Sequence, residues 1–173
     1  ENEKKIIVVD PADKGEYLYN AFKEAGFEVV AILLTHGHFD HIWGSNKLRE
    51  LAGVQVFAFE DEKDVCESSK LNVSADVGRP YEARVDWYLK DGETVSIEGM
   101  EFKVIWTPGH TQGSCCYYFE KDNILISGDT LFGGSVGRSD LPTGDGKLLS
   151  RSLKERLMIL PDETLVFPGH GNS

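Results

Sequence analysis

Long apolar runs are missing from this sequence of 173 residues, whose longest apolar stretches, such as residues 29–34, are short. A helix that spans a bilayer needs about 20 apolar residues, so we expect no membrane-spanning segment and no membrane partner. The chain also lacks a basic start followed by an apolar segment, which predicts that no signal peptide is present.

Basic residues are scarce too, because 18 Lys and Arg stand against 29 Asp and Glu and give a net charge of −11. A negative field of this size repels the phosphate backbone of nucleic acids. We therefore expect neither a nucleic-acid partner nor a nucleic-acid substrate.

Cysteine is rare, with only Cys66, Cys115 and Cys116 and no CxxC pair. Neighbouring residues of a strand point to opposite faces, so Cys115 and Cys116 are not expected to bond to each other. Reduced thiols that pack as small apolar side chains fit a cytoplasmic protein.

The sequence does have an ordinary globular composition, with 40% hydrophobic and 27% charged residues. Its length predicts one domain over residues 1–173. Short apolar runs alternate with amphipathic segments, which predicts an α/β fold. Strands are expected at residues 6–9, 29–34, 54–59, 94–97, 101–106, 114–119, 124–126 and 164–167.

The first helix is expected to begin at Asp10 and Pro11, with Asp13 and Glu16 spaced as a capping box, and to end at Gly26. Four of its side chains are expected to turn inward: Tyr17, Leu18, Ala21 and Phe22. Further helices are expected at residues 45–51, 62–67 and 148–160, and a glycine-rich loop at residues 128–146.

Four potential metal ligands fall within residues 36–41, which read His-Gly-His-Phe-Asp-His directly after a predicted strand. Extended spacing places His36 and His38 on the same side of the chain, where both imidazoles reach one ion. Asp40 and His41 follow in the turn and reach a second ion beside it. Imidazole nitrogen and carboxylate oxygen suit zinc and similar metals. The run therefore predicts a catalytic metal site rather than a polar loop with scattered histidines.

The other candidate ligands also follow strands. The two remaining histidines are His110 in TPGHTQGS and His170 in PGHG, each after an apolar strand and a Pro-Gly turn. Asp129 stands directly after the predicted strand in ILISGD. Four strand ends, including the one before His36, therefore each deliver a candidate ligand.

Taken together, these residues resemble the metallo-β-lactamase superfamily. The HxHxDH run, the later His110, Asp129 and the terminal His170 match the metal ligands of that family in order. The resemblance covers essentially the whole chain and implies a four-layer αββα sandwich of two mixed β-sheets flanked by helices. Members of the family begin ahead of Ile6 and continue past the PGHG turn, so we expect both ends of the domain to be trimmed.

The same resemblance implies two divalent metal ions, with zinc expected and iron or manganese as alternatives. It implies three ligands for each ion. It also implies that Asp129 bridges the two ions, together with a water or hydroxide. The implied ligands are His36, His38 and His110 at site one, and Asp40, His41 and His170 at site two.

Details narrow the branch of the family. Residues 128–145, GDTLFGGSVGRSDLPTGD, resemble the small glyoxalase II-like hydrolases, and the GRSD core also resembles persulfide dioxygenases. His38 disfavours the flavodiiron branch, which carries Glu there, and Asp129 disfavours the true β-lactamases, which generally lack it. Full glyoxalase II enzymes bind glutathione with the help of a helical C-terminal domain, whereas this chain stops at Ser173. The identity of the thioester is therefore open.

Other residues have two possible roles. Asp10 either supports the metal ligands or caps the helix that follows it. Arg138 either anchors an anionic substrate or pairs with Asp140 to hold the loop. Phe132 and Phe39 are candidates for the wall of the substrate pocket, with core packing as the alternative.

Two ions about 3.5–4 Å apart share a water, lower its pKa and present hydroxide to a carbonyl. The resemblance assigns all five histidines to metal, so Asp40 or a metal-bound water has to donate any proton to the leaving group. A thiolate needs little such help, because a thiol has a pKa of about 8.5. The predicted function is a dinuclear metal-dependent hydrolase of thioesters, with Asp40 as catalytic acid and a small-molecule substrate such as a glutathione thioester.

Four other functions are alternatives: a lactonase, a mononuclear iron dioxygenase that acts on persulfides, a nuclease and a non-catalytic metal-binding protein. The acidic charge argues against the nuclease. Structural zinc sites are closed and rich in cysteine, whereas this set consists of histidine and aspartate, which favours an enzyme. The sequence leaves the native metal and the oligomeric state open.

Overall fold

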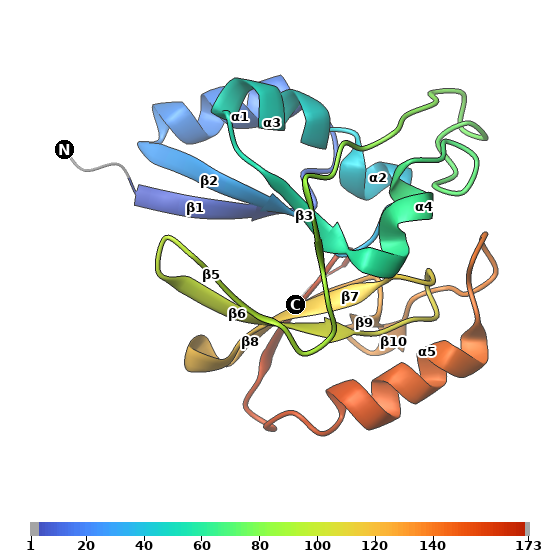
Figure 1. Cartoon of the computed structure of the whole chain (residues 1–173). Helices are drawn as coiled ribbons and strands as arrows, with labels where there is room; N and C mark the ends of the chain where they lie inside the picture. Colours follow the sequence, from blue (N-terminus) through green and yellow to red (C-terminus); the bar gives the residue numbers. More distant parts are fainter. Residues whose placement is uncertain (1–3, 172–173) are drawn as a thin grey trace.

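Two β-sheets face each other in the computed structural model, which describes residues 4–171 (Figure 1). In spatial order the first sheet contains β1 (Lys4–Val9), β2 (Phe27–Leu33), β3 (Val56–Phe59) and β4 (Trp87–Leu89). The second contains β11 (Leu165–Pro168), β8 (Ile124–Gly128), β7 (Cys115–Phe119), β6 (Met100–Trp106) and β5 (Thr94–Ile97). A separate ribbon pairs β9 (Leu131–Phe132) with β10 (Ser135–Val136).

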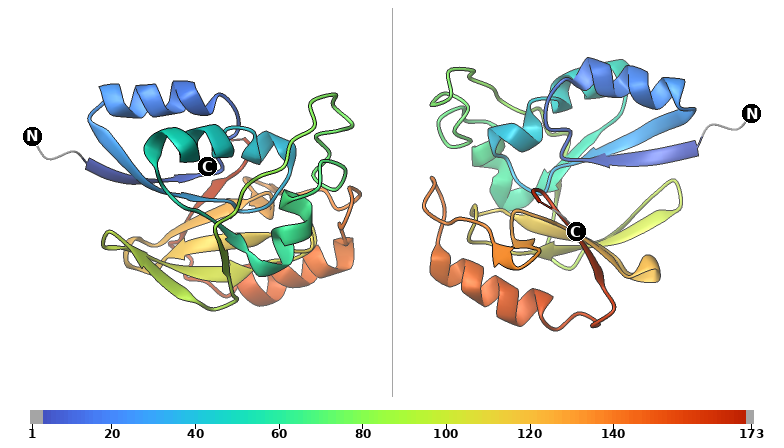
Figure 2. Two further views of the ribbon diagram at one scale, coloured as in Figure 1. Left: turned by 45° about the horizontal axis from the view of Figure 1, so that its top comes forward. Right: turned by 180° about the vertical axis from the view of Figure 1, so that it is seen from behind.

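Helices cover the outer faces of both sheets (Figures 1 and 2). Helices α1 (Gly15–Glu24) and α3 (Ser45–Ala52) lie on the first sheet, and α5 (Gly146–Ser152), which η3 (Leu153–Leu157) continues, lies on the second. Four short helical segments lie in the connections: α2 (Phe39–Ile42), η1 (Glu60–Glu62), α4 (Lys63–Cys66) and η2 (Glu120–Asp122). The four-layer αββα sandwich expected from the sequence is confirmed.

The two sheets differ in strand direction. In the second sheet β11 pairs with β8 in parallel, and the other neighbours pair antiparallel, so that this sheet is mixed as expected. Within residues 4–171 the first sheet contains parallel pairs only. The helical crossovers through α1 and α3 return the chain to the same end of that sheet, which produces parallel neighbours.

Three layers of apolar side chains fill the spaces between the four layers of the sandwich. Alternation along β2 and just beyond it sends Ile32 and Leu34 towards the helices and Leu33 towards the second sheet. In the same way Cys115 faces the first sheet and Cys116 faces η3. All three cysteines are free and buried, in agreement with the sequence.

The predicted start of the first helix is wrong. Helix α1 begins at Gly15 after Lys14, which adopts a left-handed backbone and provides no side-chain cap. The Asp13 carboxylate instead pairs with Arg79, so the expected capping box with Glu16 does not form. Tyr17, expected inside, is 69% exposed.

The carboxyl ends of three strands of the second sheet meet at one edge. Strand β8 is antiparallel to β7, which is antiparallel to β6, and β11 is parallel to β8, so β6, β8 and β11 all run in the same direction. At this edge the first sheet comes close, because the Cys115 amide donates to the Thr35 carbonyl at 2.9 Å and the Tyr117 hydroxyl donates to the Leu34 carbonyl at 2.7 Å. The loops after β2, β6, β8 and β11 therefore come together.

Within residues 4–171 no helix has both the length and the apolar character needed to cross a membrane.

Candidate metal centre

The structure brings all seven candidate ligands of the sequence to the edge where the strand ends meet. His36 and His38 follow β2, Asp40 and His41 lie in α2, and His110 follows β6. Asp129 and His170 follow β8 and β11. Their donor atoms fall into two neighbouring groups with Asp129 between them.

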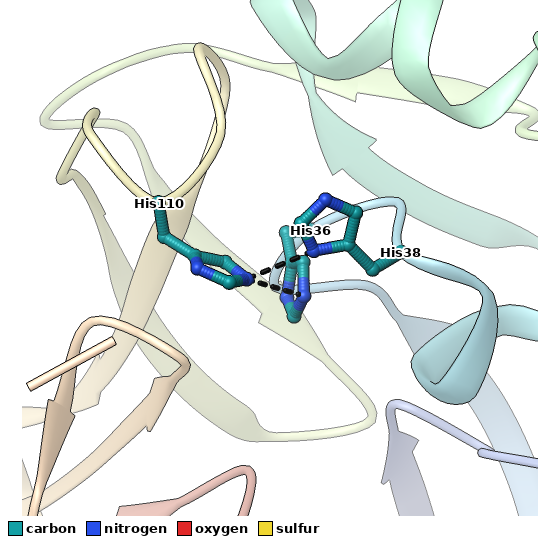
Figure 3. Close-up of side chains that lie close together, drawn as sticks. All are labelled: His36, His38 and His110. Atoms are coloured by element: carbon teal, nitrogen blue, oxygen red, sulfur yellow. Dashed lines mark hydrogen bonds between the residues drawn. The ribbon is translucent and has the colours of Figure 1, made fainter. Parts of the chain in front are cut away.

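The first group consists of His36, His38 and His110, whose imidazoles point towards one another from two different loops (Figure 3). The Nε2 atom of His110 lies 2.9 Å from Nδ1 of His38 and 3.2 Å from Nε2 of His36. All three side chains are buried. The group is therefore a compact cluster of ring nitrogens away from water.

Hydrogen bonds at the far side of two of these rings fix where their lone pairs point. Nδ1 of His110 donates to the Arg138 carbonyl at 2.7 Å. The Thr35 hydroxyl donates to Asp10 and thus accepts from Nδ1 of His36, at 3.1 Å. In the neutral rings both Nε2 atoms then carry lone pairs, and these face each other.

Two facing lone pairs repel, whereas a cation that accepts both of them turns the contact into ligation. The same cluster leaves Nε2 of His38 buried without a hydrogen-bond partner. Burial, together with the neighbouring imidazoles, holds the pKa of His36 well below its usual range and lowers that of His38 to about 3. Neutral imidazole is the form that binds a metal, so this cluster fits a cation better than it fits protons.

The second group consists of Asp40, His41 and His170. Nε2 of His170 lies 3.2 Å from Nε2 of His41 and 3.2 Å from Oδ2 of Asp40. His41 is buried, whereas the side chain of His170 is 53% exposed and that of Asp40 is 38% exposed. This group thus lies at the mouth of the site.

The Asp129 carboxylate lies between the two groups. Its Oδ2 atom is 3.6 Å from Nε2 of His110 and 3.5 Å from Nε2 of His170, and its Oδ1 atom is 3.4 Å from Nε2 of His41. Oδ1 is buried and has no hydrogen-bond partner. A Cβ atom at Gly169 would collide with this oxygen, so the glycine of the PGHG turn leaves room for the carboxylate.

Asp10 supports the centre from behind, which is the first of the two roles that the sequence allowed. Its Oδ2 atom accepts from Nδ1 of His41 at 2.9 Å, and its Oδ1 atom accepts from the Thr35 amide at 2.7 Å. Burial alone would lower the pKa of His41, but Asp10, with Asp129 and Asp40, raises it to about 9. The same carboxylates give the second group a negative field that attracts a cation.

Glu62 is the residue that sequence reasoning missed. Its side chain is completely buried and contacts the loops that carry His36, His38 and His110. The sequence does contain a signal, because Glu62 stands three residues after Phe59 and three before Val65, both of which are buried. An acidic residue in step with apolar neighbours indicates a carboxylate that faces the interior.

The two candidate substrate residues lie near the centre in different ways. The Phe132 ring centroid is 6.4 Å from that of His170. The exposed Arg138 guanidinium donates two hydrogen bonds to Asp140, at 2.7 and 2.8 Å. This pairing is the second of the two roles that the sequence allowed for Arg138. Phe39, the other aromatic candidate, packs against Trp43 with ring centroids 4.6 Å apart and ring planes tilted by 53°. A cavity of about 380 Å³ opens beside Asp40, His41 and His170.

Comparison with known proteins defines the family. A sequence profile of the metallo-β-lactamase superfamily matches residues 1–170. The probable metallo-hydrolase YqgX of Bacillus subtilis is 36% identical over 172 residues, which cover 98% of this chain and 82% of that protein. GloC of Haemophilus influenzae, named a hydroxyacylglutathione hydrolase, is 29% identical over 178 residues, which cover 99% of this chain and 82% of that protein.

Solved structures agree with this result. The B3 metallo-β-lactamase BLEG-1 superposes with a TM-score of 0.93 at 36% identity, over 99% of this chain and 84% of that one. The protein TTHA1623, solved in a di-iron-bound form, superposes with a TM-score of 0.85 at 37% identity, over 95% of this chain and 81% of that one.

The chain therefore belongs to the metallo-β-lactamase superfamily. It is a metallo-hydrolase of that family, and the fold implies divalent metal ions.

Proposed function

We propose that this protein is a dinuclear metal-dependent hydrolase of thioesters. The observation that carries the proposal is the position of Asp129, whose two carboxylate oxygens face His110 of one group and His41 and His170 of the other. A carboxylate in this position can be shared by two ions.

His36, His38 and His110 would hold one ion, and Asp40, His41 and His170 would hold a second. When bound, two divalent ions lower the pKa of a shared water and polarise the carbonyl group of a substrate. The chain contributes the geometry, because the hydrogen bonds from His110 to Arg138 and from His41 to Asp10 fix the ring orientations.

Asp40 is the proposed proton donor to the departing group. Its carboxylate is 38% exposed and lies 3.2 Å from His170, so it stands at the mouth of the site where a leaving group would depart. The five histidines are all assigned to metal and none is free for this role. A thiolate leaves with little protonation because thiols have a pKa of about 8.5, which favours thioesters over amides.

Two residues at the rim are proposed to contact the substrate. Phe132 lies beside His170 and offers an apolar wall. Arg138 carries a permanent positive charge in a strongly acidic protein and suits an anionic group such as the carboxylates of glutathione. The similarity to a protein named a hydroxyacylglutathione hydrolase supports a glutathione thioester as the first substrate to test.

The experiment offers S-lactoylglutathione, a lactone, a β-lactam and glutathione persulfide to separate samples of protein loaded with zinc, iron or manganese. Thiol release from the thioester, without oxygen uptake, is the expected result. Fast hydrolysis of the β-lactam or the lactone with no thiol release would assign a different hydrolase activity. Oxygen uptake by an iron-loaded sample given the persulfide would replace the hydrolase proposal with a dioxygenase.

A further inference from the structure

Glu62 is a carboxylate in an unusual place. It lies in η1, between β3 and α4, and its side chain has no exposed surface. Among the residues that the structure describes, no basic side chain is close enough to pair with it. A buried carboxylate without a cation is costly unless hydrogen bonds satisfy its oxygens.

Three hydrogen bonds satisfy it, and they come from both loops of the first histidine group. Oε1 accepts from the amide of Gly37, the residue between His36 and His38, at 2.7 Å. Oε2 accepts from the hydroxyl of Thr111, the residue after His110, at 2.8 Å and from the amide of Gly113 at 2.9 Å. One carboxylate thus bridges the two loops that carry the three imidazoles.

Close packing leaves these loops little freedom to find another arrangement. A Cβ atom at Gly113 would collide with the backbone nitrogen of Glu62. A Cβ atom at Gly37 would lie 3.0 Å from a methyl carbon of Val65 and 3.0 Å from the amide nitrogen of Cys66. Both loops therefore rest directly on the segment that contains Glu62, with a glycine at each point of contact.

We propose that Glu62 is a positioning residue of the metal centre, whose carboxylate sets the spacing between His110 and the His36–His38 pair and thereby the affinity for the first metal ion. This inference rests on the proposed assignment of these histidines to one ion. It does not depend on the identity of the substrate.

The substitution Glu62→Gln tests the bridge with almost no change in volume. If the amide oxygen takes the place of Oε2, the amide nitrogen faces the Gly37 N–H, and two donors meet. If the oxygen takes the place of Oε1, the nitrogen faces the Gly113 N–H instead. In the first orientation the loop of Gly37 loses its hydrogen bond, and in the second the Gly113 amide loses its acceptor while the Thr111 hydroxyl can accept from the amide nitrogen. Either change weakens the bridge between the loops, so we expect the imidazoles to shift relative to one another.

The experiment measures zinc affinity by competition with a chromophoric chelator and records the absorption spectrum of the cobalt-substituted protein. Support of ligands by neighbouring groups typically changes metal affinity about 10–100-fold, and we expect a loss of that size for the first zinc ion in Glu62→Gln. The cobalt spectrum should change as well, because it reports the ligand geometry. The matched control is Glu60→Gln, in the same turn with an exposed side chain, which should behave as the wild type.

A second pair of variants keeps the test valid if Glu62→Gln does not fold. Thr111→Val removes one hydrogen bond to Glu62, whereas Thr111→Ser keeps the hydroxyl. Zinc should bind more weakly to Thr111→Val than to Thr111→Ser, with a changed cobalt spectrum only in the former.

Glu62→Gln protein that binds zinc as tightly as the wild type, with the wild-type cobalt spectrum, overturns the inference. Equal zinc affinities and spectra for Thr111→Val and Thr111→Ser overturn it too. Wild-type protein that binds zinc tightly but releases no thiol overturns only the thioesterase proposal, because the zinc affinities of the variants still test Glu62. A wild type that binds no zinc, iron or manganese overturns both.

Discussion

Three imidazoles of the centre are held by a hydrogen bond at Nδ1 and present Nε2 to the other ligands. His110 is held by a backbone carbonyl, His41 by the Asp10 carboxylate and His36 by the Thr35 hydroxyl. These partners are an acidic group, a hydroxyl and a carbonyl, each of which accepts a hydrogen bond, so each ring in its neutral form presents a lone pair to a metal. At the scale of residues, the site is therefore arranged to bind cations before any ion arrives.

Asp129→Ala tests the bridging position. The variant should lose at least one metal equivalent and lower the thiol-release activity by more than about 100-fold, because even residues that only support ligands contribute 10–100-fold. Metal content by elemental analysis and kcat/KM provide the check. The exposed Asp162→Ala is the control and should keep both. Full occupancy in Asp129→Ala would show that the bridging assignment is wrong.

Arg138→Ala separates two roles of one residue. Its guanidinium is proposed to bind the substrate, while its backbone carbonyl, which the substitution keeps, holds His110. Loss of this charged contact should raise KM several-fold and leave kcat nearly unchanged. Arg151→Ala, which removes another exposed arginine, is the control. A drop in kcat at constant KM would assign Arg138 to the loop structure instead.

Strand ends are the elements that build this site, and the sequence predicted most of them. The apolar runs before His110, Asp129 and His170 became β6, β8 and β11, with bounds that differ by only a few residues. Local composition suffices for such strands because a short apolar run between turn residues indicates a strand, even for β11, where Leu165 and Phe167 are exposed. Their common direction, which places the three ligands at one edge, follows from pairing between distant segments.

Long-range contacts explain the elements that the sequence did not predict. Strand β4 is short and forms by pairing with β3, across the irregular segment between them. The first helix starts late because Asp10, Ala12 and Lys14 adopt left-handed backbone angles, and Asp10 is held by the distant Thr35 and His41. The spacing of Glu62 from Phe59 and Val65 indicates that its side chain faces the interior, but not what it contacts, since its three donors lie 25 to 51 residues away. Partners at such distances leave no periodic pattern in the sequence.

Helix α5 is tied to the centre through its N-cap residue, Asp145. The Asp145 side chain caps the helix by accepting from the amides of Lys147 and Leu148, at 2.8 and 3.1 Å, and its own amide donates to the Gly109 carbonyl. Asp145→Ala should lower the free energy of unfolding by about 1 kcal/mol, the usual contribution of such a cap. Urea denaturation measures it, and Asp145→Asn, which can still accept, should lose less. Equal stability of Asp145→Ala and the wild type would show that the cap contributes nothing.

At the scale of the whole molecule, the centre joins the two halves of the sandwich. The loop after β2 belongs to the first sheet, and the loops after β6, β8 and β11 belong to the second. An ion held by ligands from both sheets links them, and removal of the ions leaves facing lone pairs and uncompensated carboxylates at the junction. Metal binding and stability are therefore expected to be coupled.

Chelation should lower the melting temperature and abolish activity together. A ligand present at a hundred times its Kd stabilises the folded state by about 2.7 kcal/mol, which for a chain of this length corresponds to roughly 5–10 °C. Differential scanning fluorimetry with and without chelator provides the measurement. Asp129→Ala, which is expected to hold less metal, should show a smaller shift. Apo-protein that melts no earlier and retains its activity contradicts the coupling.

The number of metal ions per chain tests the central claim most directly. Protein purified without chelator and then equilibrated with excess zinc, followed by removal of free metal, is measured by elemental analysis against protein concentration. Two groups of ligands with Asp129 between them predict two zinc equivalents per chain. One equivalent, or none, would contradict a dinuclear centre.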